Sequence, residues 1–237
     1  MRSIDKSNIK QQGIFVDPVI FDCDGVLVDS EILALRVLER ELASRMPGIG
    51  AAPLLHNTAG ISTADILAMV EQRTGRTLPP GAVSAIIAAI DRALDQEVEP
   101  IPGVRAAIER IPAALKAVAS NSSLASVRRS VARAGLADHF GDRLFSADMV
   151  AHPKPAPDLY RYAAERLGVA PGRCLVIEDS VSGVRAAKTA GMAVIGFTGA
   201  SHVPAGQSRR LREAGASAVI DRMDGLPELV NGWRAPL

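Results

Sequence analysis

The stretch PVIFDCDGVLVDS, residues 18–30, decides how the rest of the chain is interpreted. Its apolar residues 19–21 predict a short buried strand, and Asp22 and Asp24 follow where the apolar run stops at Gly25. Side chains two residues apart on a strand point to the same face, so we expect the two carboxylates to lie side by side. Like charges that close need a cation between them, or one carboxylate keeps its proton.

The composition is that of an ordinary globular protein of one large domain or two smaller ones. Of 237 residues, 48% are hydrophobic, 22% are charged and only 3% are aromatic, with a net charge of +1 and no basic tract, so no nucleic-acid partner is expected. Residues 1–12 lack the apolar core of a signal peptide, and the apolar stretch 82–90 is far too short to span a membrane. We therefore expect a cytoplasmic protein, with a monomer as the default state. Cys23 and Cys174 lie in or beside apolar runs, which favours buried thiols over a disulfide.

Two kinds of pattern divide the chain. From the helix after the first strand, which Asp29 or Ser30 can cap, to about residue 99, only helices are predicted, among them 62–75 and either one helix or a pair over 79–98. After the Pro- and Gly-containing stretch 99–104, predicted strands (115–120, 143–147, 173–179, 193–197 and 218–221) alternate with predicted helices (124–134, 157–167 and 182–190).

This alternation predicts an α/β fold with a Rossmann-like parallel sheet that is covered by helices on both faces. We expect residues 14–32 and 100–237 to form this core domain. The helical block 33–99 is then an inserted small all-helical cap domain, and the two chain crossings near 29–31 and 99–104 are its expected pivots.

Polar residues follow four of the predicted strands, where ligand sites lie in such sheets. They are Asp22 and Asp24 after the first strand, Ser120 and Asn121 at the second, Lys154 after the third, and Glu178 and Asp179 at the fourth. Clustered carboxylates make a hard oxygen site suited to Mg²⁺. The lysine and the serine hydroxyl could bind a phosphate dianion, which leaves one of the first two aspartates to attack phosphorus and the other to move protons.

The motifs DCDGVLVDS, ASNSS, KPAPD and IEDSVSG occur in this order over about residues 18–200. Together they resemble the haloacid dehalogenase superfamily, in its phosphatase and phosphomutase branch. The resemblance implies a phosphoric monoester hydrolase in which Asp22 forms an aspartyl-phosphate and Asp24 is the general acid and then the base. Its substrate would be a small phosphorylated metabolite, such as a sugar phosphate or a phosphoglycolate-like compound.

The resemblance also implies the ligands of the site. Mg²⁺ would take the Asp22 carboxylate, the Asp24 backbone carbonyl and Asp179, with Glu178 bound directly or through water. The phosphoryl group would be held by Ser120 and Lys154, helped by Asn121. The helical block resembles the small cap of this family, which closes over the site. The nearest candidates for contacting the substrate body are Arg36, His56, Arg73 and His152, although exposed charged side chains are common without such a role.

A hexose phosphomutase is the main alternative activity. In β-phosphoglucomutase members of the family, a histidine follows the second aspartate by ten residues and a cap-loop arginine binds the distant phosphate. Here that position is Ala34, and residues 59–65 read AGISTAD, so hydrolysis is favoured. A dehalogenase is disfavoured by the acid at residue 24, and a phosphonate-cleaving enzyme by the absence of lysine from residues 33–99. A non-enzymatic phospho-aspartate signalling module would lack the large cap and would give Asp24 no proton to transfer.

Overall fold

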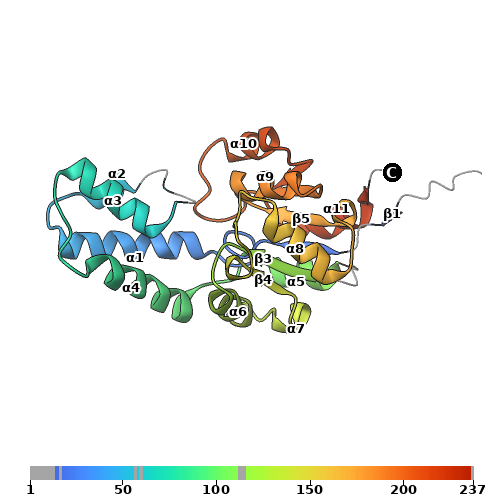
Figure 1. The fold of residues 1–237 in the computed structure, drawn as a ribbon, viewed down its shortest axis with the longest axis horizontal. Helices are drawn as coiled ribbons and strands as arrows, with labels where there is room; N and C mark the ends of the chain where they lie inside the picture. The colour runs from blue at the N-terminus through green and yellow to red at the C-terminus, as the bar shows by residue number, and fades with distance from the viewer. Residues whose placement is uncertain (1–13, 16–17, 56–57, 59–60, 112–115, 236–237) are drawn as a thin grey trace, which may run out of the picture.

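The structure is a computed structural model that describes residues 14–15, 18–55, 58, 61–111 and 116–235. Its centre is a parallel sheet of six strands in the order β4-β3-β2-β5-β6-β7 (Figure 1). The strands are β2 (Val19–Phe21), β3 (Lys116–Ser120), β4 (Leu144–Ser146), β5 (Leu175–Glu178), β6 (Ala193–Phe197) and β7 (Ala218–Ile220). The predicted α/β fold is confirmed. A separate antiparallel pair joins β1 (Ile14–Phe15) to β8 (Arg234–Ala235).

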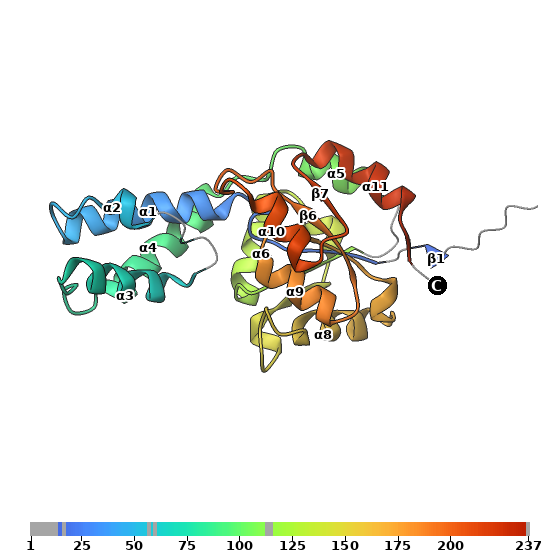
Figure 2. The same cartoon turned by 90° about the horizontal axis from the view of Figure 1, so that it is seen from above.

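Helices cover both faces of this sheet because successive strand residues alternate between two hydrophobic clusters. Val19 and Phe21 pack in one cluster and Ile20 in the other. Figure 2 shows α5 and α11 on one side of the sheet and α8 and α9 on the other. The helices of the first cluster are α5 (Val104–Arg110), α6 (Leu124–Arg133), α7 (Ala137–Phe140) and α11 (Leu226–Gly232), and those of the second are α8 (Asp158–Leu167), α9 (Val181–Thr189) and α10 (Gln207–Ala214).

Four helices extend away from the sheet and share a hydrophobic cluster of their own. They are α1 (Ser30–Arg45), α2 (Ala51–Leu54), α3 (Thr63–Thr74) and α4 (Ala82–Glu97), and α1 lies alongside α4 (Figure 1). Leu38, Leu42, Leu67 and Ile86 are buried between them. Because this block buries an apolar core separately from the sheet, we propose that residues 33–99 act as a cap domain over a core domain of residues 14–32 and 100–237.

The two chain crossings between these parts run side by side. Val28 bridges Pro100 in antiparallel fashion, and the N–H of Asp29 donates to the carbonyl of Glu99 at 2.9 Å. The N–H of Ile101 also donates to the carbonyl of Leu27 at 3.0 Å. A motion of the cap would therefore bend both crossings together, and their role as pivots stays a prediction.

Most predicted boundaries agree with the structure to within three residues, and 79–98 holds one helix. Ser62 caps α3 as expected, since its side chain accepts the N–H of Asp65. Asp29 is the N-cap residue of α1 as predicted, but its side chain makes no capping hydrogen bond and instead accepts the N–H of Ser201. Cys23 and Cys174 are buried, and neither forms a disulfide within the described residues. In the described ranges, no helix has the length and apolar composition needed to cross a bilayer.

The separate core of the cap gives a stability prediction. Ile86 is fully buried on α4, whereas Val83 on the same helix is 36% exposed. Ile86→Ala should lower the free energy of unfolding by about 2–5 kcal/mol, because it leaves a cavity among packed side chains. The matched control Val83→Ala should change it by about 0.5 kcal/mol or less. Urea denaturation followed by circular dichroism measures both, and equal losses would contradict this account of the cap.

Candidate active site

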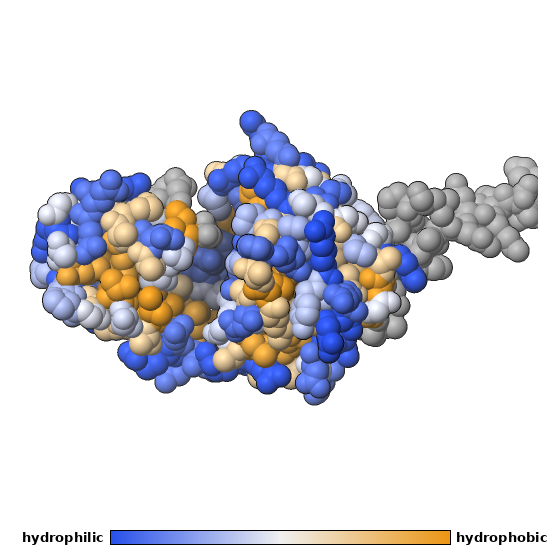
Figure 3. All heavy atoms as spheres, viewed as in Figure 1, coloured by the Kyte–Doolittle hydropathy of each residue, from blue (hydrophilic) through white to orange (hydrophobic). Residues whose placement is uncertain are grey.

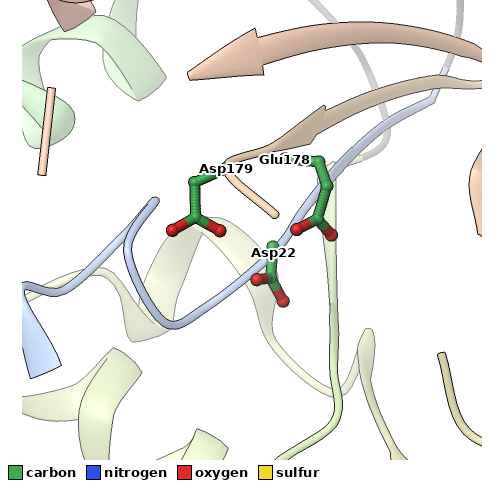
Figure 4. Close-up of side chains that lie close together, drawn as sticks. All are labelled: Asp22, Glu178 and Asp179. Carbon is green, nitrogen blue, oxygen red and sulfur yellow. The ribbon is translucent and has the colours of Figure 1, made fainter. Parts of the chain in front are cut away.

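Three buried carboxylates converge at the carboxyl ends of β2 and β5. These strands are parallel neighbours with Phe21 opposite Ile177, so Asp22 after β2 lies level with Glu178 and Asp179. Figure 4 shows the three side chains pointing toward a common space. One ligand oxygen from each lies within 4.8 Å of the others. The sequence predicted this convergence from the strand ends alone.

Lys154 lies against two of these carboxylates. Its Nζ donates to Asp22 Oδ1 and to Glu178 Oε2, each at 2.8 Å, and its side chain is only 3% exposed. The ammonium also lies 4.9 Å from the ring centroid of Tyr160, whose hydroxyl donates to Glu178 Oε2 at 2.8 Å. The lysine therefore joins the two strand ends through a buried ion-pair network.

Asn121 fixes the loop that carries this lysine. Its side-chain Nδ2 donates to the backbone carbonyl of Lys154, and its Oδ1 accepts the backbone N–H of Lys154, both at 2.9 Å. The amide thus hydrogen-bonds both the N–H and the carbonyl of Lys154, and it links the end of β3 to the loop that carries the lysine. In this structure the Asn121 side chain therefore positions Lys154, using its Oδ1 and one of the two N–H donors on Nδ2.

Glu178 is held on its other oxygen by the start of α9. Its Oε1 accepts the N–H of Ser180 at 3.0 Å and the hydroxyl of Ser180 at 2.7 Å. The same hydroxyl caps the helix by accepting the N–H of Gly183 at 3.0 Å. A Cβ at Gly183 would lie 2.0 Å from the Glu178 carboxylate, so a side chain cannot fit there. This contact explains the glycine in the fourth motif.

The carboxylate of Asp24 lies in a different environment. Its Oδ1 accepts the Ser30 hydroxyl at 2.7 Å, and its Oδ2 accepts the hydroxyls of Ser122 at 2.7 Å and Ser120 at 3.2 Å. Among the described residues it is not one of the three carboxylates grouped within 4.8 Å. β2 ends at Phe21, so the strand alternation behind the predicted side-by-side pair does not extend to Asp24, and that placement stays a prediction.

Burial and like charges leave this cluster electrostatically unbalanced. Burial, followed by the Glu178 carboxylate, raises the pKa of Asp22 well above its usual value despite Lys154. Burial, followed by Glu178 and Glu31, does the same to the pKa of Asp179. Burial alone would also raise the pKa of Glu178, but Lys154 and the hydrogen bonds that Glu178 accepts outweigh it and lower that pKa. One ammonium therefore neutralises only part of the charge.

A hard divalent cation fits the remaining charge and the oxygen donors. Three carboxylates offer ligand atoms within 4.8 Å of one another, on side chains that are almost fully buried. Oxygen ligands at about 2.0–2.1 Å from Mg²⁺ lie roughly 3–4 Å from each other, which small side-chain shifts would provide. The donor set contains no sulfur, which favours a hard ion.

Several residues of the site were missed by the sequence analysis: Tyr160, Ser30, Ser122, Ser180, His202 and Gln207. His202 Nε2 lies 3.4 Å from Asp179 Oδ2, and Gln207 Nε2 donates to the Asp179 carbonyl at 2.7 Å. Both come from the segment between β6 and β7, where no element was predicted. The serines stand inside the quoted motifs, so their hydroxyls were a signal that could have been used.

A cavity of about 870 Å³ opens above the carboxylates, between the strand ends and the proposed cap. Figure 3 shows the molecule hollowed between these two parts. All the predicted site residues except Glu178 line it, and so do Leu35, Leu38 and Ile66 from the helical block. Of the four candidates for substrate contact, Arg36, Arg73 and His152 are exposed and do not line it, and His56 lies outside the described residues.

Comparison with known proteins gives consistent matches. The model of the haloacid dehalogenase-like hydrolase family matches residues 16–191, which contain all four motifs. The 6-phosphogluconate phosphatase of Escherichia coli K12 is 29% identical over 188 residues, 79% of this chain and 85% of that protein. Hexitol phosphatase B of the same strain is 34% identical over 178 residues, which are 73% of this chain and 79% of that protein. The crystal structure of a haloacid dehalogenase-like protein from Agrobacterium tumefaciens is 38% identical, has a TM-score of 0.82, and covers 92% of this chain and 98% of its own.

The unbalanced charge predicts that a divalent cation stabilises the fold. Mg²⁺ at a hundred times its dissociation constant should raise the free energy of unfolding by about 2.7 kcal/mol. Asp179→Asn should abolish most of this increase, whereas Asp142→Asn, an exposed acid before β4, should keep it. Thermal unfolding with and without the ion measures the effect. An undiminished increase in Asp179→Asn would place the ion elsewhere.

The raised pKa values predict a pH dependence for the metal-free protein. A carboxyl whose folded pKa lies above its unfolded value stabilises the fold at low pH, and this contribution is lost as pH rises through the folded pKa. As the pH rises above 3.8, the usual pKa of an aspartate, Asp179 should thus destabilise the fold increasingly. In a chelator, Asp179→Asn should gain stability relative to the wild type as pH rises from about 4 to 8. A difference between the two that does not change with pH would be the contrary result.

Proposed function

Because the chain belongs to the haloacid dehalogenase-like hydrolase family, we propose that it is a Mg²⁺-dependent phosphatase of a small phosphorylated metabolite. The observation that carries this proposal is the buried Asp22 carboxylate, which lies between Lys154 and Asp179 at the edge of a large cavity. Two relatives named as phosphatases of 6-phosphogluconate and of hexitol phosphates support a sugar phosphate as the substrate.

Asp22 is proposed as the nucleophile. Lys154 binds its Oδ1, so Oδ2 is the oxygen that attacks phosphorus. As the Oδ2–P bond forms, the ester P–O bond breaks and the leaving oxygen takes a proton from Asp24. A water molecule then attacks the aspartyl-phosphate, Asp24 accepts its proton, and the Asp22 carboxylate leaves as inorganic phosphate forms. The hydroxyls of Ser30 and Ser122 would hold Asp24 in place during both proton transfers.

Asp22, Asp179 and the backbone carbonyl of Asp24 are the proposed direct ligands of Mg²⁺. When bound, the ion would offset the repulsion between the carboxylates and an anionic substrate. Glu178 already accepts two hydrogen bonds on each carboxylate oxygen, from Lys154 and Tyr160 on one and from Ser180 on the other. This saturation favours an indirect role, in which Glu178 contacts the ion only through water and orients Lys154.

Ser120 and Lys154 are proposed to bind the phosphoryl oxygens, and Asn121 to help by positioning. Ser120 is 1% exposed, and its hydroxyl already lies 3.2 Å from Asp24 Oδ2, beside the reacting groups. Lys154 keeps a positive charge because Asp22 and Glu178 raise its pKa, although burial alone would lower it. A permanent ammonium next to the nucleophile would stabilise charge on the transferred group.

Hydrolysis is proposed in preference to phosphomutation. Ala34 lines the cavity at the position where the resemblance predicts a proton-transferring histidine in a mutase. A methyl group can neither donate nor accept a proton, so it cannot activate a sugar hydroxyl as the acceptor. Water is then the available acceptor of the phosphoryl group, and it needs only Asp24 as its base.

The proposal is tested by phosphate release. The purified protein with Mg²⁺ should release inorganic phosphate from p-nitrophenyl phosphate and from members of a panel of sugar phosphates, and a chelator should abolish the release. No release from any phosphomonoester, with Mg²⁺ or Mn²⁺, would refute the proposal. A product isomer formed faster than phosphate, with a bisphosphate primer present, would instead indicate a mutase.

Substitution of Asp22 and of Asp24 should lower the activity for different reasons. Asp22→Asn should lower kcat at least ~10³-fold, because the amide cannot form the acyl-phosphate. Asp24→Asn should lower kcat by about 10²–10⁴-fold, because only proton transfer is lost. Mass spectrometry after an acid quench should find a phosphorylated Asp22 peptide in the wild type and none in Asp22→Asn. Both variants should keep the wild-type circular dichroism spectrum, and substantial activity in Asp22→Asn would overturn the assignment.

A further inference from the structure

Two arginines line the cavity that contains Asp22 and Lys154. Arg185 comes from α9 and Arg210 from α10, and both are exposed to solvent. In the described part of the chain, neither has a carboxylate within ion-pair distance. Arg209, next to Arg210 in the sequence, differs because it pairs with Glu213 at 2.7 Å and does not line the cavity. The two cavity arginines are therefore available to a ligand.

Helical spacing places each arginine near another cavity residue on the same helix face. Arg185 follows Ser182 by three residues on α9, and Arg210 follows Gln207 by three on α10, so each pair shares one helix face. Ser182 and Gln207 also line the cavity, and Gln207 binds the carbonyl of Asp179. Each arginine thus lies about 4.5 Å of helical rise from another residue that lines the cavity.

On the opposite walls of the cavity, the described residues carry no matching positive charge. The described residues of the helical block that line it are apolar, hydroxyl-bearing or acidic: Ala34, Leu35, Leu38, Thr58, Ile61, Ser62, Thr63, Ile66, Ile90, Asp91 and Leu94. Asp91 also borders a smaller cavity near α6, together with Asp95. The α9–α10 side, at the top of Figures 1 and 3, is hydrophilic around α10. Among the described residues, the arginines that line the cavity therefore lie on its α9–α10 side.

We infer that Arg185 and Arg210 bind a second anionic group of the substrate, remote from the phosphoryl group that is transferred. This inference rests on the proposed phosphatase function and narrows its substrate class to phosphorylated sugar acids or bisphosphates. A guanidinium binds a carboxylate or a phosphate through two parallel hydrogen bonds, which gives orientation as well as affinity. The distal charge is thus recognised by the core, and the cap supplies apolar and hydroxyl contacts.

The test compares substrates that differ only at the end remote from the phosphate. An aldonic acid 6-phosphate carries a distal carboxylate, a hexose bisphosphate carries a distal phosphate, and a hexitol 6-phosphate is neutral there. The wild type should have a higher kcat/KM for at least one of the two anionic-ended compounds than for the neutral one. The ratio of kcat/KM for that anionic-ended compound to kcat/KM for the neutral one should fall about tenfold in the double variant Arg185→Gln/Arg210→Gln, mainly through KM. The control Arg209→Gln should keep the wild-type ratio. The two anionic substrates then distinguish a carboxylate from a phosphate as the distal group.

Equilibrium binding separates a failure of this inference from a failure of the proposed function. Calorimetry on Asp22→Asn with Mg²⁺ should show tighter binding of an anionic-ended phosphate than of the hexitol 6-phosphate, and the added arginine substitutions should remove the difference. If the protein hydrolyses p-nitrophenyl phosphate but does not prefer the anionic-ended substrates over the hexitol 6-phosphate, only the inference is overturned. No hydrolysis of any substrate would overturn the proposed function, and equal binding of all three compounds would then reject the inference as well. The same loss of preference in Arg209→Gln would also count against it.

Discussion

The structure depends on a buried excess of negative charge at the carboxyl ends of β2 and β5. Lys154 relieves part of it by binding Asp22 and Glu178, but burial still raises the pKa of Asp22 and Asp179. Buried charges are costly unless they are paired and hydrogen-bonded, so the surrounding chain must hold these groups closely. A Cβ at Gly25 would lie 2.0 Å from Asp179 Oδ2, which leaves room there only for glycine.

The same excess charge connects the fold to the proposed chemistry. Three buried carboxylates with a single lysine leave negative charge unpaired in the free protein. A divalent cation would therefore stabilise this site strongly, with the lysine still beside it. Asn121 holds the backbone of Lys154 through two hydrogen bonds, and Ser180 holds Glu178 through two more. These contacts fix the charged groups before any substrate arrives, which is how a preorganised site stabilises a transition state.

Much of the core followed from the sequence because apolar runs define buried parallel strands and polar residues mark their ends. The run 193–197 has the same bounds as β6. Patterns failed where a segment carries little apolar signal: only Leu211 of α10 is buried, and this helix brings Gln207 to the site. They also failed at Tyr160, whose partner Glu178 is distant in sequence. Long-range polar contacts have no local periodicity.

The placement of the cavity's cations constrains how a substrate would be selected. Arg185 and Arg210 project from helices that pack on the sheet, and the start of α10 is tied to Asp179 through Gln207. Their distance from the proposed nucleophile is therefore set by the core and does not depend on the position of the cap. A substrate with charge at both ends would be oriented before closure, because long-range attraction acts in the open cavity. Closure would then add apolar contact from Leu35 and Ile66 and exclude water, so the cap would discriminate by shape and the core by charge.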